Sequence, residues 1–147
     1  MKKLLVLLII FISLTGCSKD NKFYLDDKLY NSGTYIEINK EELDNLQNNK
    51  SSYLLFTYNS YCTFKVPCDN IFEEVMKKYN IDVYKMPFEL MKKTFIYEKV
   101  KYVPSLIIIN KGKIVTYLDA NKESDLEKYQ NSNKFENWLD KYIYLKK

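Results

Sequence analysis

One hydrophobic run organises the pattern of the chain: residues 53–58, with the sequence YLLFTY. Aromatic, aliphatic and β-branched residues follow one another there without polar alternation, which predicts a strand buried on both faces. Asn59 and Ser60 end the run. From Ile71 to Tyr79, apolar residues recur at helical spacing, with Glu and Lys on the opposite face. This segment is therefore predicted to be an amphipathic helix.

Strands and helices alternate along the rest of the chain. Thr34–Ile38 alternates like a short strand, and Asn39 with Glu42 predicts a capped helix start. Further strands are expected at 82–86, 105–110 and 114–118, with helices at 90–99 and 135–143 and a hairpin turn at 111–112. This order predicts one α/β domain in which helices cover both faces of a mixed sheet.

Two cysteines lie between the buried strand and the amphipathic helix. Cys62 is expected in the loop, and Cys68 in or beside the first helical turn, where Pro67 also fits. The positive end of a helix dipole favours a thiolate. The two thiols are therefore a candidate redox site.

Composition narrows the classes of function. The chain has 147 residues, of which 46% are hydrophobic and 29% charged, so a single globular domain with a core is expected. Without Lys2 and Lys3, 21 lysines face 19 acidic residues, a balance too small to indicate nucleic-acid binding. The absence of Arg and His excludes most familiar hydrolase mechanisms and His metal ligands.

The N-terminus has the features of an export signal. Residues 1–16 combine two lysines with a short apolar run. The following Leu14-Thr15-Gly16-Cys17 resembles the lipobox of bacterial lipoproteins, in which the cysteine is lipidated and becomes the mature N-terminus. The resemblance implies a protein held by Cys17 on the extracytoplasmic face of the cell membrane; the alternative is an ordinary secreted protein. Residues 17–33 are interpreted as a flexible tether before a domain at 34–147, with an extra strand at 23–25 as the alternative.

The order of elements and the segment from Val100 to Lys113, VKYVPSLIIINKGK, resemble the thioredoxin family. The resemblance covers about residues 34–144 and implies a thioredoxin-like three-layer α/β/α sandwich. It also implies a cis peptide bond between Val103 and Pro104, facing the cysteine pair. The alternative is a trans proline at the start of an edge strand.

The chain departs from the family pattern at the cysteines. Five residues separate Cys62 from Cys68, where the usual family motif has two, although an aromatic residue, Tyr61, still precedes the first cysteine. Leu55 or Phe56 stands where many thioredoxins bury an acidic residue that accepts a proton from the buried cysteine. Some Gram-positive lipoproteins and bacteriocin transport accessory proteins are similar diverged thioredoxins.

By this resemblance, Cys62 and Cys68 form a disulfide and carry catalysis. Export places them where disulfides persist, and lipidation occupies Cys17. Family position makes Cys62 the attacking thiol, whereas helix electrostatics alone favour Cys68. Tyr61, Val103 and Pro104 are expected to border the substrate, which would pair with the backbone at Val103.

Two functions follow as hypotheses. The first is a membrane-anchored thiol–disulfide oxidoreductase that acts on exported proteins and needs a membrane redox partner. The second is a non-catalytic binding or accessory lipoprotein whose disulfide between Cys62 and Cys68 only shapes a loop. No cofactor is expected, and two cysteines without a third ligand do not make a zinc site.

Overall fold

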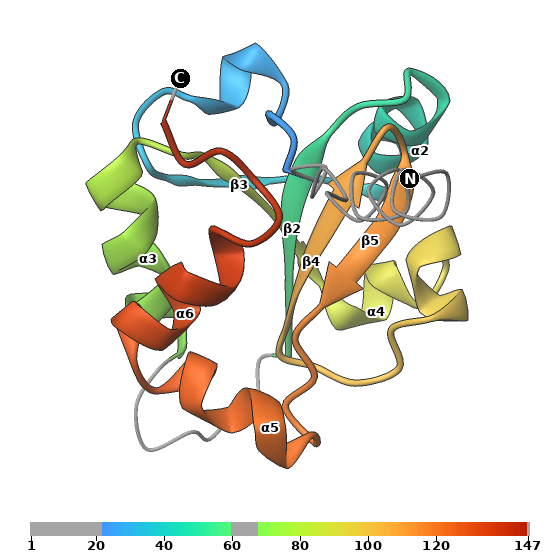
Figure 1. Cartoon of the computed structure of the whole chain (residues 1–147). Helices are drawn as coiled ribbons and strands as arrows, with labels where there is room; N and C mark the ends of the chain where they lie inside the picture. Colours follow the sequence, from blue (N-terminus) through green and yellow to red (C-terminus); the bar gives the residue numbers. More distant parts are fainter. Residues whose placement is uncertain (1–21, 60–67, 147) are drawn as a thin grey trace, which may run out of the picture.

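The computed structural model describes residues 22–59 and 68–146, which form a five-stranded sheet flanked by helices (Figure 1). The strand order is β1-β3-β2-β4-β5. The strands are β1 (Tyr35–Glu37), β2 (Tyr53–Tyr58), β3 (Val83–Pro87), β4 (Ser105–Asn110) and β5 (Lys113–Tyr117). The helices are η1 (Asp27–Leu29), α2 (Lys40–Asn48), α3 (Cys68–Tyr79), α4 (Phe88–Met91), η2 (Phe95–Glu98), α5 (Glu123–Leu126), η3 (Glu127–Tyr129) and α6 (Ser132–Leu139).

Strand β2 is the centre of the sheet, as its sequence predicts. It pairs in parallel with β3 and antiparallel with β4, and its residues from Tyr53 to Thr57 are buried. Strand β4 then pairs antiparallel with β5 across the predicted hairpin, where Lys111 and Gly112 adopt positive φ. The mixed sheet expected from the order of elements is confirmed.

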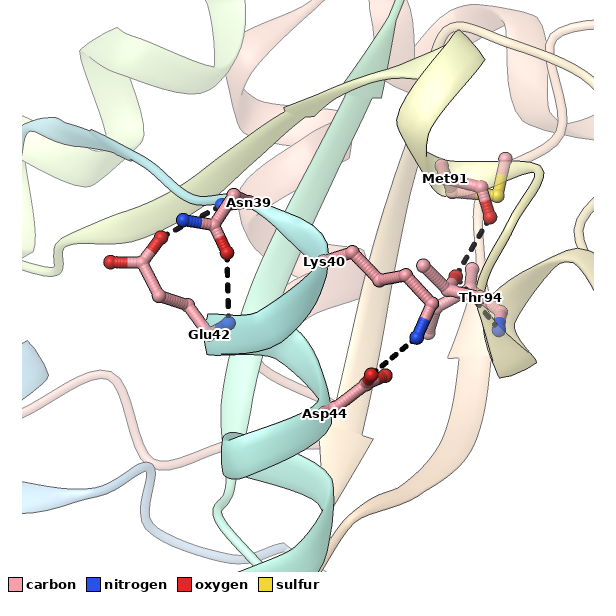
Figure 2. Close-up of polar contacts among 7 residues, drawn as sticks. Asn39, Lys40, Glu42, Asp44, Met91 and Thr94 are labelled. Atoms are coloured by element: carbon pink, nitrogen blue, oxygen red, sulfur yellow. Dashed lines mark hydrogen bonds and ion pairs between the residues drawn. The ribbon is translucent and has the colours of Figure 1, made fainter.

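Helices cover both faces of the sheet. Helices α3 and α6 pack together on one face, and α2 and α4 lie on the other (Figure 1). The predicted cap of α2 is confirmed: the Asn39 side chain accepts from the Glu42 amide at 3.0 Å, and the Glu42 carboxylate accepts from the Asn39 amide at 2.8 Å (Figure 2). The resulting sandwich has an apolar layer on each side of the sheet.

The helix predicted at 90–99 is instead two short helices, α4 and η2. Thr94 separates them, because its hydroxyl donates to the Met91 carbonyl at 2.7 Å and accepts from the Ile96 amide at 3.3 Å (Figure 2). A threonine that satisfies backbone groups in this way competes with helical hydrogen bonds and starts a new turn.

The C-terminal helix also differs from the prediction. Helix α6 begins earlier, because the Asn131 side chain caps it by accepting from the Lys134 amide, and it ends at Leu139. Ile143 belongs instead to an isolated β-bridge with Phe23. The turns of α5 and η3, which precede α6, have no periodic apolar pattern and were not predicted.

Residues 22–33 lie against the domain, which corrects the expectation of a tether for this segment. Leu25 and Leu29 are buried in the core, and the Asp26 amide donates to the Ser52 carbonyl at 2.8 Å. The alternative, an extra strand at 23–25, is present only as the single bridge of Phe23. The signal segment 1–16 and Cys17 lie outside the described residues.

Candidate redox site

Cys68 is the first residue of α3, and its side chain is only 3% exposed. The apolar face of the helix, which includes Phe72, packs into the core. Burial of this face positions the first turn of α3, and with it the Cys68 thiol, against the sheet. Cys62 and Tyr61 lie outside the described residues.

The peptide bond between Val103 and Pro104 is cis, which confirms the expectation from the resemblance. Ser105 follows at the start of β4 and pairs with Thr57 near the end of β2. Because directly opposed residues of antiparallel strands have Cα atoms about 5 Å apart, Pro104 lies beside the end of β2. The chain leaves β2 at this same end and returns at Cys68.

Tyr129 connects Pro104 with the surroundings of Cys68. Its buried hydroxyl donates to the Pro104 carbonyl at 2.8 Å, and its ring centroid lies 5.6 Å from that of Phe72 in α3. Burial, and next the nearby Cys68, raise the pKa of Tyr129 above its ordinary value. The phenol therefore stays neutral and acts as a hydrogen-bond donor. Sequence reasoning missed it, because η3 has no recognisable pattern.

A charged cluster also contacts the first turn of α3. The Lys85 ammonium in β3 is 3.4 Å from Asp69 Oδ2, and the Cys68 thiol donates to Asp69 Oδ1 over 3.7 Å. Tyr35 in β1 donates to the Asp69 backbone carbonyl at 3.3 Å. Burial, and after it the charges of Asp69 and Cys68, raise the pKa of Tyr35.

The position at which the family resemblance suggests a buried acid is apolar in the structure. Leu55 and Phe56 are both fully buried. Asp69 instead supplies a carboxylate to the thiol from the helix. Its place next to Cys68 in the sequence was the available signal, but its pairing with Lys85 could not be read from the sequence.

The described residues offer no metal centre and no membrane span. Between residues 22 and 59 and between 68 and 146, no group of three or more His, Cys, Asp or Glu side chains could hold a metal ion. None of the described helices is long and apolar enough to cross a bilayer.

The structure is similar to solved thioredoxins at low sequence identity. A thioredoxin from Entamoeba histolytica with a cysteine-to-serine substitution is 17% identical, with 65% of this chain and 96% of that chain covered and a TM-score of 0.50. Thioredoxin O1 from Arabidopsis thaliana in the oxidised state is 17% identical, with 70% of this chain and 96% of that chain covered and a TM-score of 0.49. Thioredoxin from Schistosoma mansoni is 20% identical, with 66% of this chain and 93% of that chain covered and a TM-score of 0.47.

Sequence comparisons give no further assignment. No family model matches the chain, and no curated protein matches it. The mixed sheet, the helices on both of its faces and the likeness to the Entamoeba protein nevertheless agree. The chain has a thioredoxin fold.

Proposed function

We propose that this protein is a thiol–disulfide oxidoreductase that acts through Cys62 and Cys68 on disulfides of exported proteins. The observation that carries the proposal is the position of Cys68. A buried thiol at the start of α3 lies at the same end of the sheet as the cis peptide bond before Pro104.

The proposed reaction is two exchanges of thiolate for disulfide. The Cys62 thiolate attacks one sulfur of a partner's disulfide, forms a mixed disulfide and releases the partner's other sulfur as a thiolate. The Cys68 thiolate then attacks the Cys62 sulfur, which releases the partner's remaining sulfur. The partner's disulfide is reduced to two thiols, its departing thiolates take up protons, and Cys62 and Cys68 are oxidised to a disulfide. Renewed turnover needs a membrane redox partner that returns two electrons.

Burial supports the assignment of the two roles. The Cys68 side chain is 3% exposed, so its sulfur is not accessible to the disulfide of another protein. Attack by Cys68 on the mixed disulfide at Cys62 is intramolecular and requires no access for a second protein. Cys68 is therefore proposed as the resolving thiol, which leaves Cys62 as the attacking one.

Substrate is proposed to bind along the segment before β4. Lys101 and Tyr102 are exposed, Val103 is half-buried and Pro104 is buried, so the chain passes from solvent into the core at this point. An extended peptide would pair with the backbone of Val103 as an added strand. Tyr61 is proposed to border the same peptide.

A lipid on Cys17 is proposed to anchor the domain on the extracytoplasmic membrane face. Asp26 is hydrogen-bonded to Ser52, just before β2, whereas Cys68 follows the opposite end of that strand. The six residues of β2 span about 17 Å. Asp26 and Cys68 therefore lie near opposite ends of β2. In cells fed radiolabelled palmitate, the chain should carry label, and Cys17→Ala should abolish both labelling and membrane retention.

Trapping of mixed disulfides tests the catalytic proposal. Cys68→Ser removes the resolving thiol, so this variant should accumulate covalent adducts with envelope proteins that dithiothreitol releases. Cys62→Ser and the double variant should form none and serve as matched controls. Absence of adducts from Cys68→Ser would overturn the proposal.

A non-catalytic binding module is the second candidate. The apolar character of Leu55 and Phe56 favours it, because no carboxylate on β2 serves the buried thiol at these positions. This candidate predicts no adducts with either single variant, and a disulfide that resists mild thiols.

A further inference from the structure

Strand β5 pairs with β4 on one side, and on its other side no strand of the described residues lies against it (Figure 1). The Leu118 amide donates to the Leu106 carbonyl at 2.9 Å, and Tyr117 lies opposite Ile107. Because bonded and non-bonded pairs alternate along antiparallel strands, the backbone N–H and C=O of Tyr117 point away from β4. The outer edge of β5 therefore presents backbone hydrogen-bonding groups.

A groove of about 580 Å³ lies beside this edge. It is lined by residues 114–117 of β5 and, from other segments, by Lys99, Asp119, Asn121, Lys122 and Asp125. The register between β4 and β5 shifts after Ile108, which leaves Val115 without an opposite residue on β4. The Val115 side chain is 45% exposed, although it is aliphatic. An extended chain placed in the groove would cover this valine and pair with the backbone of β5.

The acidic residues of the groove are already engaged, and its lysines are not. Asp125 pairs with Lys128 at 2.9 Å and also accepts from the Asp119 amide at 3.1 Å. The Asp119 carboxylate accepts from the backbone amide two residues further on at 2.9 Å. Lys99 and Lys122 are exposed, and in the part of the chain that the structure describes no carboxylate forms an ion pair with either. Two cations thus remain for a ligand.

A second copy of β5 fits this edge less well than an acidic peptide does. Lys113 begins the strand and is exposed, so pairing of two β5 strands would bring several lysines of both copies together. Like charges that face each other across strands are destabilising, and lysines on an edge strand oppose association of two edges. A peptide with carboxylate side chains avoids this repulsion and is attracted by the same lysines.

We propose that the outer edge of β5 binds an extended acidic segment of a partner protein as an added strand. The backbone of Tyr117 pairs with the segment, and Val115 contacts one of its apolar side chains. Lys99 and Lys122 pair with its carboxylates. This surface is separate from the segment at Val103, which precedes β4, and its role does not depend on the proposed redox reaction.

A fluorescein-labelled peptide tests this surface directly. The peptide is a short chain that alternates Glu and Val, and its binding to the purified full chain is followed by fluorescence anisotropy. Reversal of both lysines, Lys99→Glu with Lys122→Glu, should weaken binding by about tenfold. The same peptide with N-methylated backbone amides cannot pair as a strand and should also bind more weakly.

Charge reversals elsewhere on the surface provide matched controls. Lys93→Glu with Lys141→Glu changes the net charge equally at exposed positions outside the groove, and this variant should bind as the wild type does. Lys101→Glu, close to the proline segment, should likewise leave binding unchanged. Far-UV circular dichroism verifies that each variant is folded.

Several results would overturn the inference. The first is absence of binding, or equal binding of a peptide in which Lys replaces Glu. Binding that Lys101→Glu weakens and the groove reversals do not would place the peptide at the segment of Val103 instead. A wild-type chain that sediments as a dimer, and that Val115→Lys dissociates, would assign the edge to a second copy. Absence of trapped adducts from Cys68→Ser, by contrast, would remove catalysis and leave this binding surface intact.

Discussion

Two charged residues near the start and middle of β3 are satisfied in different ways. Asp82, directly before the strand, is 2% exposed and accepts five hydrogen bonds from Asn31, Ser32 and Thr34 at 2.9–3.3 Å. Lys85, three residues later, has one carboxylate partner and aromatic neighbours. Asp82 is thus held by neutral hydrogen-bond donors only. Asp69, the carboxylate partner of Lys85, also accepts a hydrogen bond from the Cys68 thiol.

By this comparison, the charge of Asp82 has a structural role, whereas the charge of Lys85 lies close to the candidate redox site. Asp82 ties Asn31, Ser32 and Thr34 to the start of β3. Burial alone would raise its pKa, but the hydrogen bonds from Thr34, Asn31 and Ser32 outweigh burial and hold the pKa below its ordinary value. Its removal should therefore affect stability, and removal of Lys85 should affect the thiol.

The largest expected effect is loss of stability on removal of the Asp82 carboxylate. Asp82→Ala leaves the donors of residues 31–34 without their acceptor and should lower the free energy of unfolding by about 3 kcal/mol at pH 7. Urea denaturation measures the change. Asp140→Ala, which removes an exposed partner of Lys22, should cost less than about 1 kcal/mol. Equal losses of unfolding free energy in the two variants would contradict the structural role assigned to Asp82.

The pH dependence of stability should depend on the same carboxyl. A group whose folded pKa lies below its unfolded value, about 3.9 for Asp, stabilises the fold fully above that unfolded pKa. The contribution is lost as the pH falls through the folded pKa. The difference in unfolding free energy between wild type and Asp82→Asn should therefore narrow on acidification below about pH 4. A difference that stays constant across a urea series at several pH values would contradict the assignment.

A smaller effect is expected where Tyr129 supports the proline segment. Tyr129→Phe removes the hydrogen bond to the buried Pro104 carbonyl and should lower the free energy of unfolding by about 1 kcal/mol. The matched control is Tyr117→Phe, whose hydroxyl donates to Lys99 at an exposed site. If Tyr117→Phe costs as much as Tyr129→Phe in urea denaturation, the buried bond has no special role.

The smallest stability effect is expected for Lys85. Lys85→Met keeps the apolar stem and loses one ion pair, so the free energy of unfolding should change by less than about 1 kcal/mol. The same variant should still change the reactivity of Cys68, because Lys85 pairs with the carboxylate that accepts from its thiol. A loss above about 2 kcal/mol in urea denaturation would place Lys85 with Asp82 as a structural charge.

Much of the fold could be predicted because its signals are local. The run at 53–58 gave the central strand, and Asn39 with Glu42 gave the start of α2. The cis bond before Pro104 came from the family resemblance, since a proline by itself favours trans.

The missed features depend on contacts between distant parts of the chain. Leu25 and Leu29 stand in a polar segment, and only their packing against the completed domain shows that they belong to the core. Thr94 has a weak local preference, and its two hydrogen bonds decide where α4 ends. For the site, Cys68 and Pro104 could be predicted from the sequence, but the pairing of Asp69 with Lys85, which joins a helix to a strand, could not.

The most direct test of the central claim is the covalent state of the two cysteines. The purified full chain is oxidised with glutathione disulfide, digested without reduction and analysed by mass spectrometry, then treated with dithiothreitol and analysed again. The account predicts one disulfide-linked peptide that contains Cys62 and Cys68 and separates on reduction. Two independently modified thiols, with no linked peptide under any oxidising condition, would contradict it.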